Sequence, residues 1–313
     1  MIDKDVDSYE KVNYLLRLRK QIERKMIIEM MQKLSKEISI NEYHYLGFGS
    51  VYFADFILFH KYLHINNMTS LEKDRKKKKR FEFNLPYKFI NLEMKSSSEY
   101  LRKKINWKSN PLFLWLDYDC FIDFDVIEDL KYIAKNSKPK DILLITVDAD
   151  CPEKLEDLEQ FLKDYRKYIG SDITVKKAKE DFPQVLLRIV DSAINQGKNL
   201  RISTDKIKIS QLLNLSYKDT SRMYTYGCLF ERPDSSIVKE CDLKKLDFIS
   251  TGKDVFKIDC PLLTPKEKFH LDSGITKNKE CMDIEKKTGL KKSIINKYSI
   301  FYKYYPQYFE SIY

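Results

Sequence analysis

The sequence lacks the features that define several classes of protein. No stretch approaches 18 consecutive apolar residues, so we expect no membrane-spanning helix. The start, Met1–Asp5, carries early acids and no apolar run, which argues against a secretory signal. The six cysteines are scattered without a C-x-x-C pair, and neither a P-loop nor a G-x-S-x-G elbow is present. We therefore expect a cytoplasmic protein with reduced thiols and without a zinc site.

What is present is a globular composition with an excess of positive charge. The 313 residues are 43% apolar and include 18 Phe and 21 Tyr, which suits one large α/β domain with an appendage. The formal net charge is +10. A basic surface attracts phosphates, so binding or modification of nucleic acid is one interpretation. The abundance of Lys, Ile, Asn and Tyr is also typical of an AT-rich prokaryotic genome, and we favour that explanation of the charge.

Short apolar runs alternate with helical patterns up to about residue 195. Strands are expected at 43–46, 68–71, 89–94, 112–116 and 142–147, with 212–217 and 223–230 as the last strands of the sheet. Helices are expected at 51–63, 126–134, 155–168 and 185–194, and after Lys73 and Ser96. This alternation predicts an α/β fold with a doubly wound, mostly parallel sheet. The expected organisation is N-terminal helices over 1–40, a Rossmann-like domain over 41–232 and a mostly helical C-terminal appendage over 233–313.

Both ends of the chain carry helical patterns. Apolar residues recur at helical spacing over 8–38, and we expect their Met-rich face to be core. Two further helices are expected at 282–287 and 292–302. The second opens a tail of lysines and aromatic residues between Lys297 and Phe309. Such a tail packs back onto its own domain or docks a partner, either a protein or nucleic acid, and we favour packing.

The segment Gly47-Phe48-Gly49-Ser50 follows the first expected strand and precedes a helical run. Glycine permits a sharp turn and a close approach of the backbone to a ligand. Glu72 lies 23 residues after Gly49, at the end of the next expected strand. An acidic residue near this distance accepts hydrogen bonds from ribose hydroxyls in Rossmann-type sites. The combination predicts a nucleotide cofactor, although an ordinary strand-to-helix turn is the alternative.

With these motifs in this order, residues 40–150 resemble class I S-adenosylmethionine-dependent methyltransferases. The wider chain is similar to prokaryotic O-methyltransferase-like proteins, for example at 80–86 (RFEFNLP) and 115–119 (WLDYD). The resemblance implies S-adenosylmethionine as cofactor and transfer of a methyl group to an oxygen or nitrogen atom of an unidentified acceptor. It implies that the cofactor is bound by Gly47, Phe48, Gly49, Ser50, Glu72, Lys73, Ser97 and Asp117.

Two pairs of acids, Asp117 with Asp119 and Asp148 with Asp150, follow the fourth and fifth expected strands. The carboxyl ends of parallel strands share one edge of a sheet, so these acids are expected to face a ligand there. We predict Asp117 and Asp119 as catalytic residues, with Asp117 as the first candidate for a general base. The pattern also resembles cation-dependent O-methyltransferases, which implies a Mg²⁺ site at Asp117 and Asp148. Capping of the following helices is the alternative role for these acids.

Two positions depart from the methyltransferase motif. Tyr45 stands two residues before the first glycine, where the family has an acid, and Ser50 stands near the place of a third glycine. These departures leave a second hypothesis open. In it, the domain keeps the Rossmann-like fold without turnover and serves as a partner-binding subunit of a larger assembly.

Overall fold

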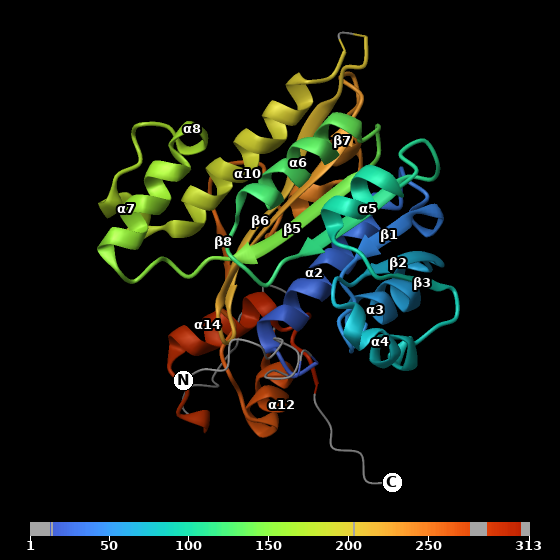
Figure 1. The fold of residues 1–313 in the computed structure, drawn as a ribbon. Coiled ribbons are helices and arrows are strands. Elements are labelled where there is room, and N and C mark those ends of the chain that lie inside the picture. The colour runs from blue at the N-terminus through green and yellow to red at the C-terminus, as the bar shows by residue number, and fades with distance from the viewer. Residues whose placement is uncertain (1–12, 14, 203, 276–286, 308–313) are drawn as a thin grey trace.

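A computed structural model describes residues 13, 15–202, 204–275 and 287–307. Its centre is one eight-stranded sheet with the strand order β3-β2-β1-β4-β5-β7-β6-β8 (Figure 1). The strands are β1 (His44–Gly47), β2 (Asn67–Leu71), β3 (Ile90–Glu93), β4 (Leu112–Asp117), β5 (Ile142–Asp148), β6 (Lys208–Lys218), β7 (Arg222–Glu231) and β8 (Phe256–Ile258). The predicted α/β class with a mostly parallel sheet is confirmed.

The pairing of the strands decides which edge of the sheet holds a ligand. β1 pairs in parallel with β2 and β4, β2 with β3, and β4 with β5. β7 is antiparallel to both β5 and β6, so β6 runs in the same direction as β5. The order is that of a Rossmann fold with one antiparallel strand inserted before β6. The carboxyl ends of β1, β2, β4, β5 and β6 therefore meet at one edge.

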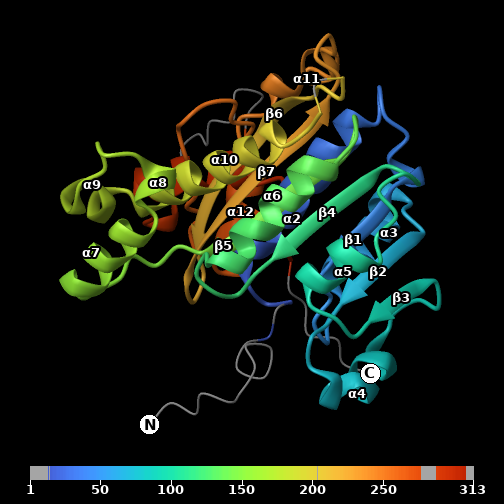
Figure 2. The same ribbon diagram turned by 45° about the horizontal axis from the view of Figure 1, so that its top comes forward.

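Helices cover both faces of the sheet. α2 and α3 pack in one core with Tyr45, Trp115 and Leu213, whereas α5, α6 and α10 pack in the other. Figures 1 and 2 show these helices along the sheet from two directions. The larger helices are α2 (Leu18–Leu34), α3 (Ala54–Leu63), α4 (Lys78–Asn84), α5 (Ser97–Lys103), α6 (Phe124–Asn136), α7 (Leu155–Asp164), α10 (Phe182–Asn199), α12 (Pro265–Gly274) and α14 (Lys292–Phe301). The short ones are η1 (Ile40–Glu42), η2 (Arg75–Lys77), α8 (Arg166–Ile169), α9 (Val175–Glu180), α11 (Ile237–Glu240) and η3 (Leu243–Lys245).

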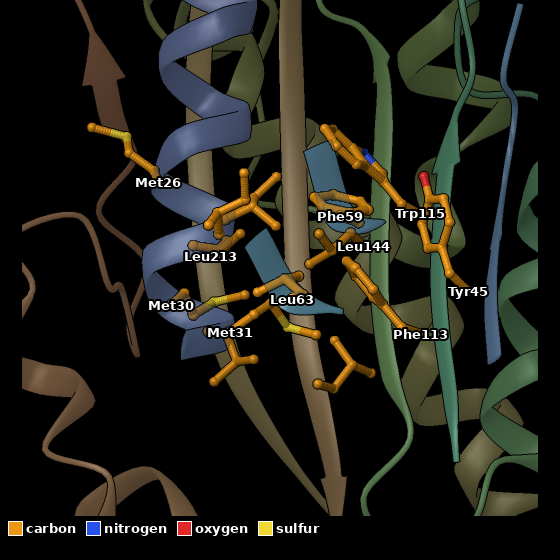
Figure 3. Close-up of a cluster of buried hydrophobic side chains, with 14 of the residues drawn as sticks. Met26, Met30, Met31, Tyr45, Phe59, Leu63, Phe113, Trp115, Leu144 and Leu213 are labelled. Carbon is orange, nitrogen blue, oxygen red and sulfur yellow. The ribbon is translucent and has the colours of Figure 1, made fainter. Parts of the chain in front are cut away.

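Two faces of apolar packing fix this arrangement. On the α2 side, Met26, Met30 and Met31 are fully buried beside Leu213, so the Met-rich face is core, as expected (Figure 3).

Within the part of the chain that the structure describes, no helix combines the length and the apolar character needed to cross a bilayer.

Two expected segments lie partly or largely outside the described residues. The helical pattern over 8–38 is represented by α2, which begins at Leu18, and residues 1–12 lie outside the described range. The helix expected at 282–287 also lies almost entirely outside it. The C-terminal part adds an edge strand, β8, which pairs with β6. A three-residue strand carries too short a pattern to be recognised in a sequence.

Candidate functional site

The glycine turn lies at the carboxyl edge of the sheet, directly after β1. Gly49 donates its backbone N–H to the Ser70 hydroxyl on β2 at 3.1 Å. A Cβ atom at Gly49 would stand 2.8 Å from the same oxygen, and one at Gly47 would stand 3.1 Å from the Trp115 carbonyl. The shortest contacts would be with Tyr45 at 2.4 Å for Gly47 and with Phe53 at 2.5 Å for Gly49. A side chain at either glycine would therefore require neighbouring side chains to shift.

The residues after Gly49 form a tight loop before the helix. Ser50 and Phe53 have φ values of 47° and 46°, a left-handed conformation that is uncommon for residues other than glycine. The Phe53 N–H closes the loop onto the Gly49 carbonyl at 2.7 Å. Helix α3 consequently starts at Ala54, three residues later than expected. Phe48 packs its ring on Tyr118, with 5.2 Å between centroids, so the loop also touches the residue after β4.

Glu72 follows β2 beside this turn. In the parallel register Gly47 lies opposite Ser70, which places Glu72 two residues beyond the end of β1 on the neighbouring strand. Its carboxylate accepts the Asp74 N–H at 3.2 Å and is half-buried, while Lys73 is exposed. The structure thus brings the predicted ribose-binding acid and the glycine turn together at one edge.

Ser97 lies in the first turn of α5, where its side chain is held by protein groups. The Ser97 hydroxyl donates to Asp129 at 2.8 Å and accepts from the Tyr118 hydroxyl at 2.9 Å. Ser96 caps the helix by accepting the Glu99 N–H at 3.2 Å. The predicted cap is therefore present, and the Ser97 hydroxyl is already engaged within the fold.

Tyr45, the residue in place of the family acid, is fully buried in β1. Its ring packs edge-on against Phe56 and Phe59 at 4.8 and 4.9 Å between centroids. Figure 3 shows Tyr45 and Phe59 within the buried cluster. Its hydroxyl has no hydrogen-bond partner in the described residues. Burial raises the pKa of Tyr45 well above its usual value, and nearby Asp55 and Asp117 raise it further. Tyr45 is neutral at pH 7 and supplies no negative charge.

Asp117 ends β4 and forms a buried ion pair with the N-terminal helix. Its Oδ2 lies 2.7 Å from Lys20 Nζ, and that ammonium also lies 2.9 Å from Glu23 Oε2. Lys20 stands 4.4 Å from the centroid of the Trp115 ring. Burial alone lowers the pKa of Lys20, but the two carboxylates outweigh it and raise this pKa above its ordinary value. Lys20 is therefore a buried cation that holds Asp117 in place.

The network extends from Glu23 into the middle of the sheet. Glu23 accepts a hydrogen bond from Thr225 on β7, and Thr225 lies 2.8 Å from the Thr146 hydroxyl on β5. Thr146 in turn accepts the Trp115 indole N–H at 3.0 Å. Burial raises the pKa of Glu23, although Lys20 opposes this shift. Three neighbouring strands are thus tied to helix α2 through polar groups.

A second buried ion pair joins α2 to the helix after the glycine turn. Arg24, one residue from Glu23, donates to the Asp55 carboxylate in the first turn of α3. Both side chains are less than 10% exposed. Helix α2 consequently supports the turn as well as Asp117, which makes it part of the site.

Sequence reasoning missed these charged residues of α2. Lys20, Glu23, Arg24 and Ile27 follow the i, i+3, i+4, i+7 spacing of one helix face, which continues as an apolar face through Leu34. Charged residues in line with an apolar face indicate buried ion pairs when acids and bases alternate. That signal is visible in the sequence at Lys20, Glu23 and Arg24.

The other acids of the edge are dispersed. Asp119 is exposed, and Asp148 accepts the Asp150 N–H at 2.8 Å. Burial raises the pKa of Asp148. In the described ranges no group of three His, Cys, Asp or Glu side chains is arranged to hold a metal ion. The predicted Mg²⁺ site at Asp117 and Asp148 is not supported, because Asp117 is paired with Lys20.

The aromatic tail packs against its own chain. Tyr298 and Phe301 are buried side chains of α14. The Tyr304 hydroxyl donates a hydrogen bond to Glu29 of α2. Tyr305 accepts the Leu263 N–H at 3.1 Å. Tyr308 and Phe309 lie outside the described residues. Docking of a partner through this tail stays a prediction.

The sheet order, with the glycine turn after β1 and an acid after β2, defines a Rossmann-like fold. The chain belongs to the family described as "Putative O-methyltransferase", whose model matches residues 12–313. This membership confirms the predicted resemblance. No curated protein matches the sequence.

Solved structures of methyltransferases are similar in fold at low identity. Trm1 from Pyrococcus horikoshii, with S-adenosyl-L-methionine, matches 72% of this chain and 57% of its own, at 11% identity and TM-score 0.47. An arsenic(III) S-adenosylmethionine methyltransferase from Chlamydomonas reinhardtii matches 63% and 66%, at 10% and 0.39. An S-adenosylmethionine-dependent methyltransferase from Clostridium acetobutylicum matches 71% and 96%, at 10% and 0.41. The chain spans less than two thirds of the length of the first two of these proteins.

Proposed function

We propose that this protein binds S-adenosylmethionine at the glycine turn and Glu72 and transfers its methyl group to an oxygen atom of an acceptor. The observation that carries the proposal is the juxtaposition of that turn with the half-buried Glu72 carboxylate at the carboxyl edge of the sheet. Membership of an O-methyltransferase family supports the choice of oxygen as acceptor atom.

The residues of the turn fit such a cofactor. Gly47 and Gly49 let the turn pack closely on its neighbours, while Phe48 and Ser50 between and after them are partly exposed at the edge. Glu72 offers carboxylate oxygens to ribose hydroxyls. Lys73, exposed beside it, lies within the same loop. Phe48, packed edge-to-face against Tyr118, supplies an apolar wall. The Ser97 hydroxyl is hydrogen-bonded to Asp129, so Ser97 does not contact the cofactor through this group. In this proposal its role is to hold helix α5 in position.

When bound, S-adenosylmethionine supplies an electrophilic methyl group on a sulfonium; its C–S bond breaks as a C–O bond to the acceptor forms. The acceptor hydroxyl loses its proton in this step, and a carboxylate is suited to receive it. Asp117 and Asp119 are our candidates. Lys20 orients Asp117 through the 2.7 Å ion pair, whereas Asp119 is exposed to an incoming acceptor. Mg²⁺ has no role in this assignment.

The test is calorimetric titration of the full chain with S-adenosylmethionine and S-adenosylhomocysteine. Glu72→Gln removes a charged hydrogen-bond acceptor, so we expect affinity to fall about 10- to 100-fold. Glu82→Gln, an exposed change on α4 beside Lys78, is the matched control and leaves affinity unchanged. No binding of either compound by the wild-type protein, with binding of another nucleotide, would refute the proposal.

A second candidate is a domain that binds the cofactor or a partner without turnover. Tyr45 in place of the family acid and the engagement of Asp117 by Lys20 favour it. Methyl transfer by the purified protein to any hydroxylated acceptor would exclude this candidate, since a non-catalytic module transfers nothing.

A further inference from the structure

A pocket of about 480 Å³ opens at the carboxyl edge of the sheet, beyond Asp117. Its walls come from the end of β6 (Ser216–Asp219), the end of β8 (Lys257–Asp259), Arg19 at the start of α2 and Arg222 at the start of β7. Because β6 and β8 run parallel to each other and in the direction of β5, the pocket lies on the same edge as the glycine turn.

Contacts between neighbouring residues lead from the proposed methyl-transfer site to this pocket. Arg19 adjoins Lys20, whose ammonium is paired with Asp117. The Arg222 N–H donates to Asp150 at 3.3 Å, and the Arg222 carbonyl accepts the Ala149 N–H at 2.8 Å. The pocket is therefore next to the residues that follow β5.

Tyr217 separates the pocket from the buried ion pairs. It lines the pocket, and Lys20 Nζ lies 5.7 Å from the centroid of its ring. Its buried hydroxyl has no hydrogen-bond partner in the described ranges. Tyr217 thus forms a common wall of the pocket and of the Lys20–Asp117 pair.

The pocket is rich in cations, and its acids are already engaged. Asp219 accepts the backbone N–H groups of Arg19 and Lys20 at 3.0 and 3.1 Å and so caps α2. Asp259 is paired with Lys297. Asp219 also lies 3.7 Å from the Arg19 guanidinium. The lining holds four cations, Arg19, Lys218, Arg222 and Lys257, against these two acids, so it keeps a net positive charge.

Two of the cations have no such partner. The side chains of Arg222 and Lys257 make no hydrogen bond or ion pair with the described residues, whereas Arg19 donates to the Cys260 carbonyl and Lys218 lies 3.9 Å from Asp150. Arg222 is half-buried, and its guanidinium presents a fork of donors that suits an oxyanion.

We propose that this pocket binds the oxyanion group, a carboxylate or a phosphate, of the methyl acceptor, with Arg222 and Lys257 as its principal contacts. The inference rests on the proposed function, because it makes the pocket the acceptor's side of the methyl-transfer site. The acceptor is then a hydroxylated compound that carries an anionic group, anchored beyond Tyr217 while its hydroxyl faces Asp117 and Asp119.

The test titrates the full chain with inorganic phosphate and, separately, with benzoate, at low ionic strength, with and without saturating S-adenosylhomocysteine. Line broadening of the phosphate ³¹P signal and saturation-transfer NMR of benzoate report binding. We expect one saturable site for at least one anion, with the anion and S-adenosylhomocysteine bound together. Arg222→Gln and Lys257→Gln should each weaken the anion about 10-fold. Lys253→Gln, an exposed lysine outside the pocket, should not.

Preference for phosphate or for benzoate identifies the acceptor's anion, and either supports the proposal. It is overturned if neither anion saturates, if Lys253→Gln weakens binding as much as Lys257→Gln, or if the anion competes with S-adenosylhomocysteine. The variants are first compared with wild type in thermal unfolding, so that loss of fold is not read as loss of binding. Failure of S-adenosylhomocysteine to bind, by contrast, rejects the proposed function and with it the acceptor role of the pocket.

Discussion

At the scale of the residue, the buried pair of Lys20 and Asp117 has the largest predicted effect on stability. Lys20→Met leaves Asp117 and the fully buried Glu23 without their countercharge. Removing one partner of a buried ion pair typically costs about 3–5 kcal/mol, so we expect the free energy of unfolding to fall by that amount. Denaturant unfolding followed by circular dichroism measures it.

The control and the coupling test use the same helix. Lys33→Met changes a lysine in the last turn of α2 that makes no ion pair with the residues the structure describes, and we expect a change within about 0.5 kcal/mol. The double variant Lys20→Met with Asp117→Asn should lose less than the sum of the two single variants, since position 117 then carries no charge that lacks its partner. Additive losses would contradict the role given to the pair.

Asp141 provides a prediction about pH. Burial raises the pKa of Asp141 to about 6, although its carboxylate accepts the N–H groups of Leu112 and Lys138 at 2.8 Å. An acid whose pKa is higher in the folded chain contributes stability below its unfolded pKa of about 4, and this contribution is lost as pH rises to about 6. Asp141→Asn should therefore remove a decline in unfolding free energy between pH 4 and 6.

The measurement is denaturant unfolding of wild type and variant at pH 4, 5, 6 and 7. The difference between the two should change with pH in this window, whereas the exposed Asp234→Asn should shift stability by the same amount at every pH. A pH-independent difference for Asp141→Asn would show that this carboxyl group has an ordinary pKa.

At the scale of the element, one close contact fixes helix α10 on helix α6. A Cβ atom at Gly197 would stand 2.7 Å from the Lys131 Cα of α6, so Gly197→Ala must push the two helices apart. Overpacking of this kind costs about 1–3 kcal/mol. Gly252→Ala is the control, because nothing lies within 4 Å of the added atom. Thermal unfolding compares the two, and equal melting temperatures would contradict the close packing.

The elements were largely predictable from sequence because buried parallel strands are short apolar runs. The run at 112–116 became β4, and the run at 142–147 became β5, each extended by its terminal aspartate. The position of α2 was not predictable in the same way. Its charged residues form pairs with Asp55 and Asp117, which are distant in the chain, and a sequence pattern carries no information on which acid meets which base.

The candidate site was predictable only where its signals are local in the sequence. The glycine turn and Glu72 are local signals at strand ends, and the fold brings them together. Whether the acids converge depends on the directions of their side chains. The ion pair with Lys20 sets the direction of the Asp117 side chain, and the sequence pattern does not reveal that pair. The basic pocket depends on strand β8, which the sequence did not indicate.

At the scale of the whole molecule, binding of the cofactor product should stabilise the fold. A ligand at 100 times its dissociation constant adds about 2.7 kcal/mol to the free energy of unfolding. For a chain of 313 residues this corresponds to a rise in melting temperature of about 4 °C. Thermal unfolding with S-adenosylhomocysteine measures the shift, and Glu72→Gln at the same ligand concentration should reduce it. An equal shift in both proteins would place the ligand elsewhere.

The most direct test of the central claim is a crystal structure of the protein with S-adenosylhomocysteine. The account predicts the ligand at the carboxyl edge of the sheet, against the backbone of 47–50, with its ribose hydroxyls within hydrogen-bonding distance of Glu72. Ligand bound away from β1 and β2, or an unchanged edge in crystals grown with saturating ligand, would contradict the assignment.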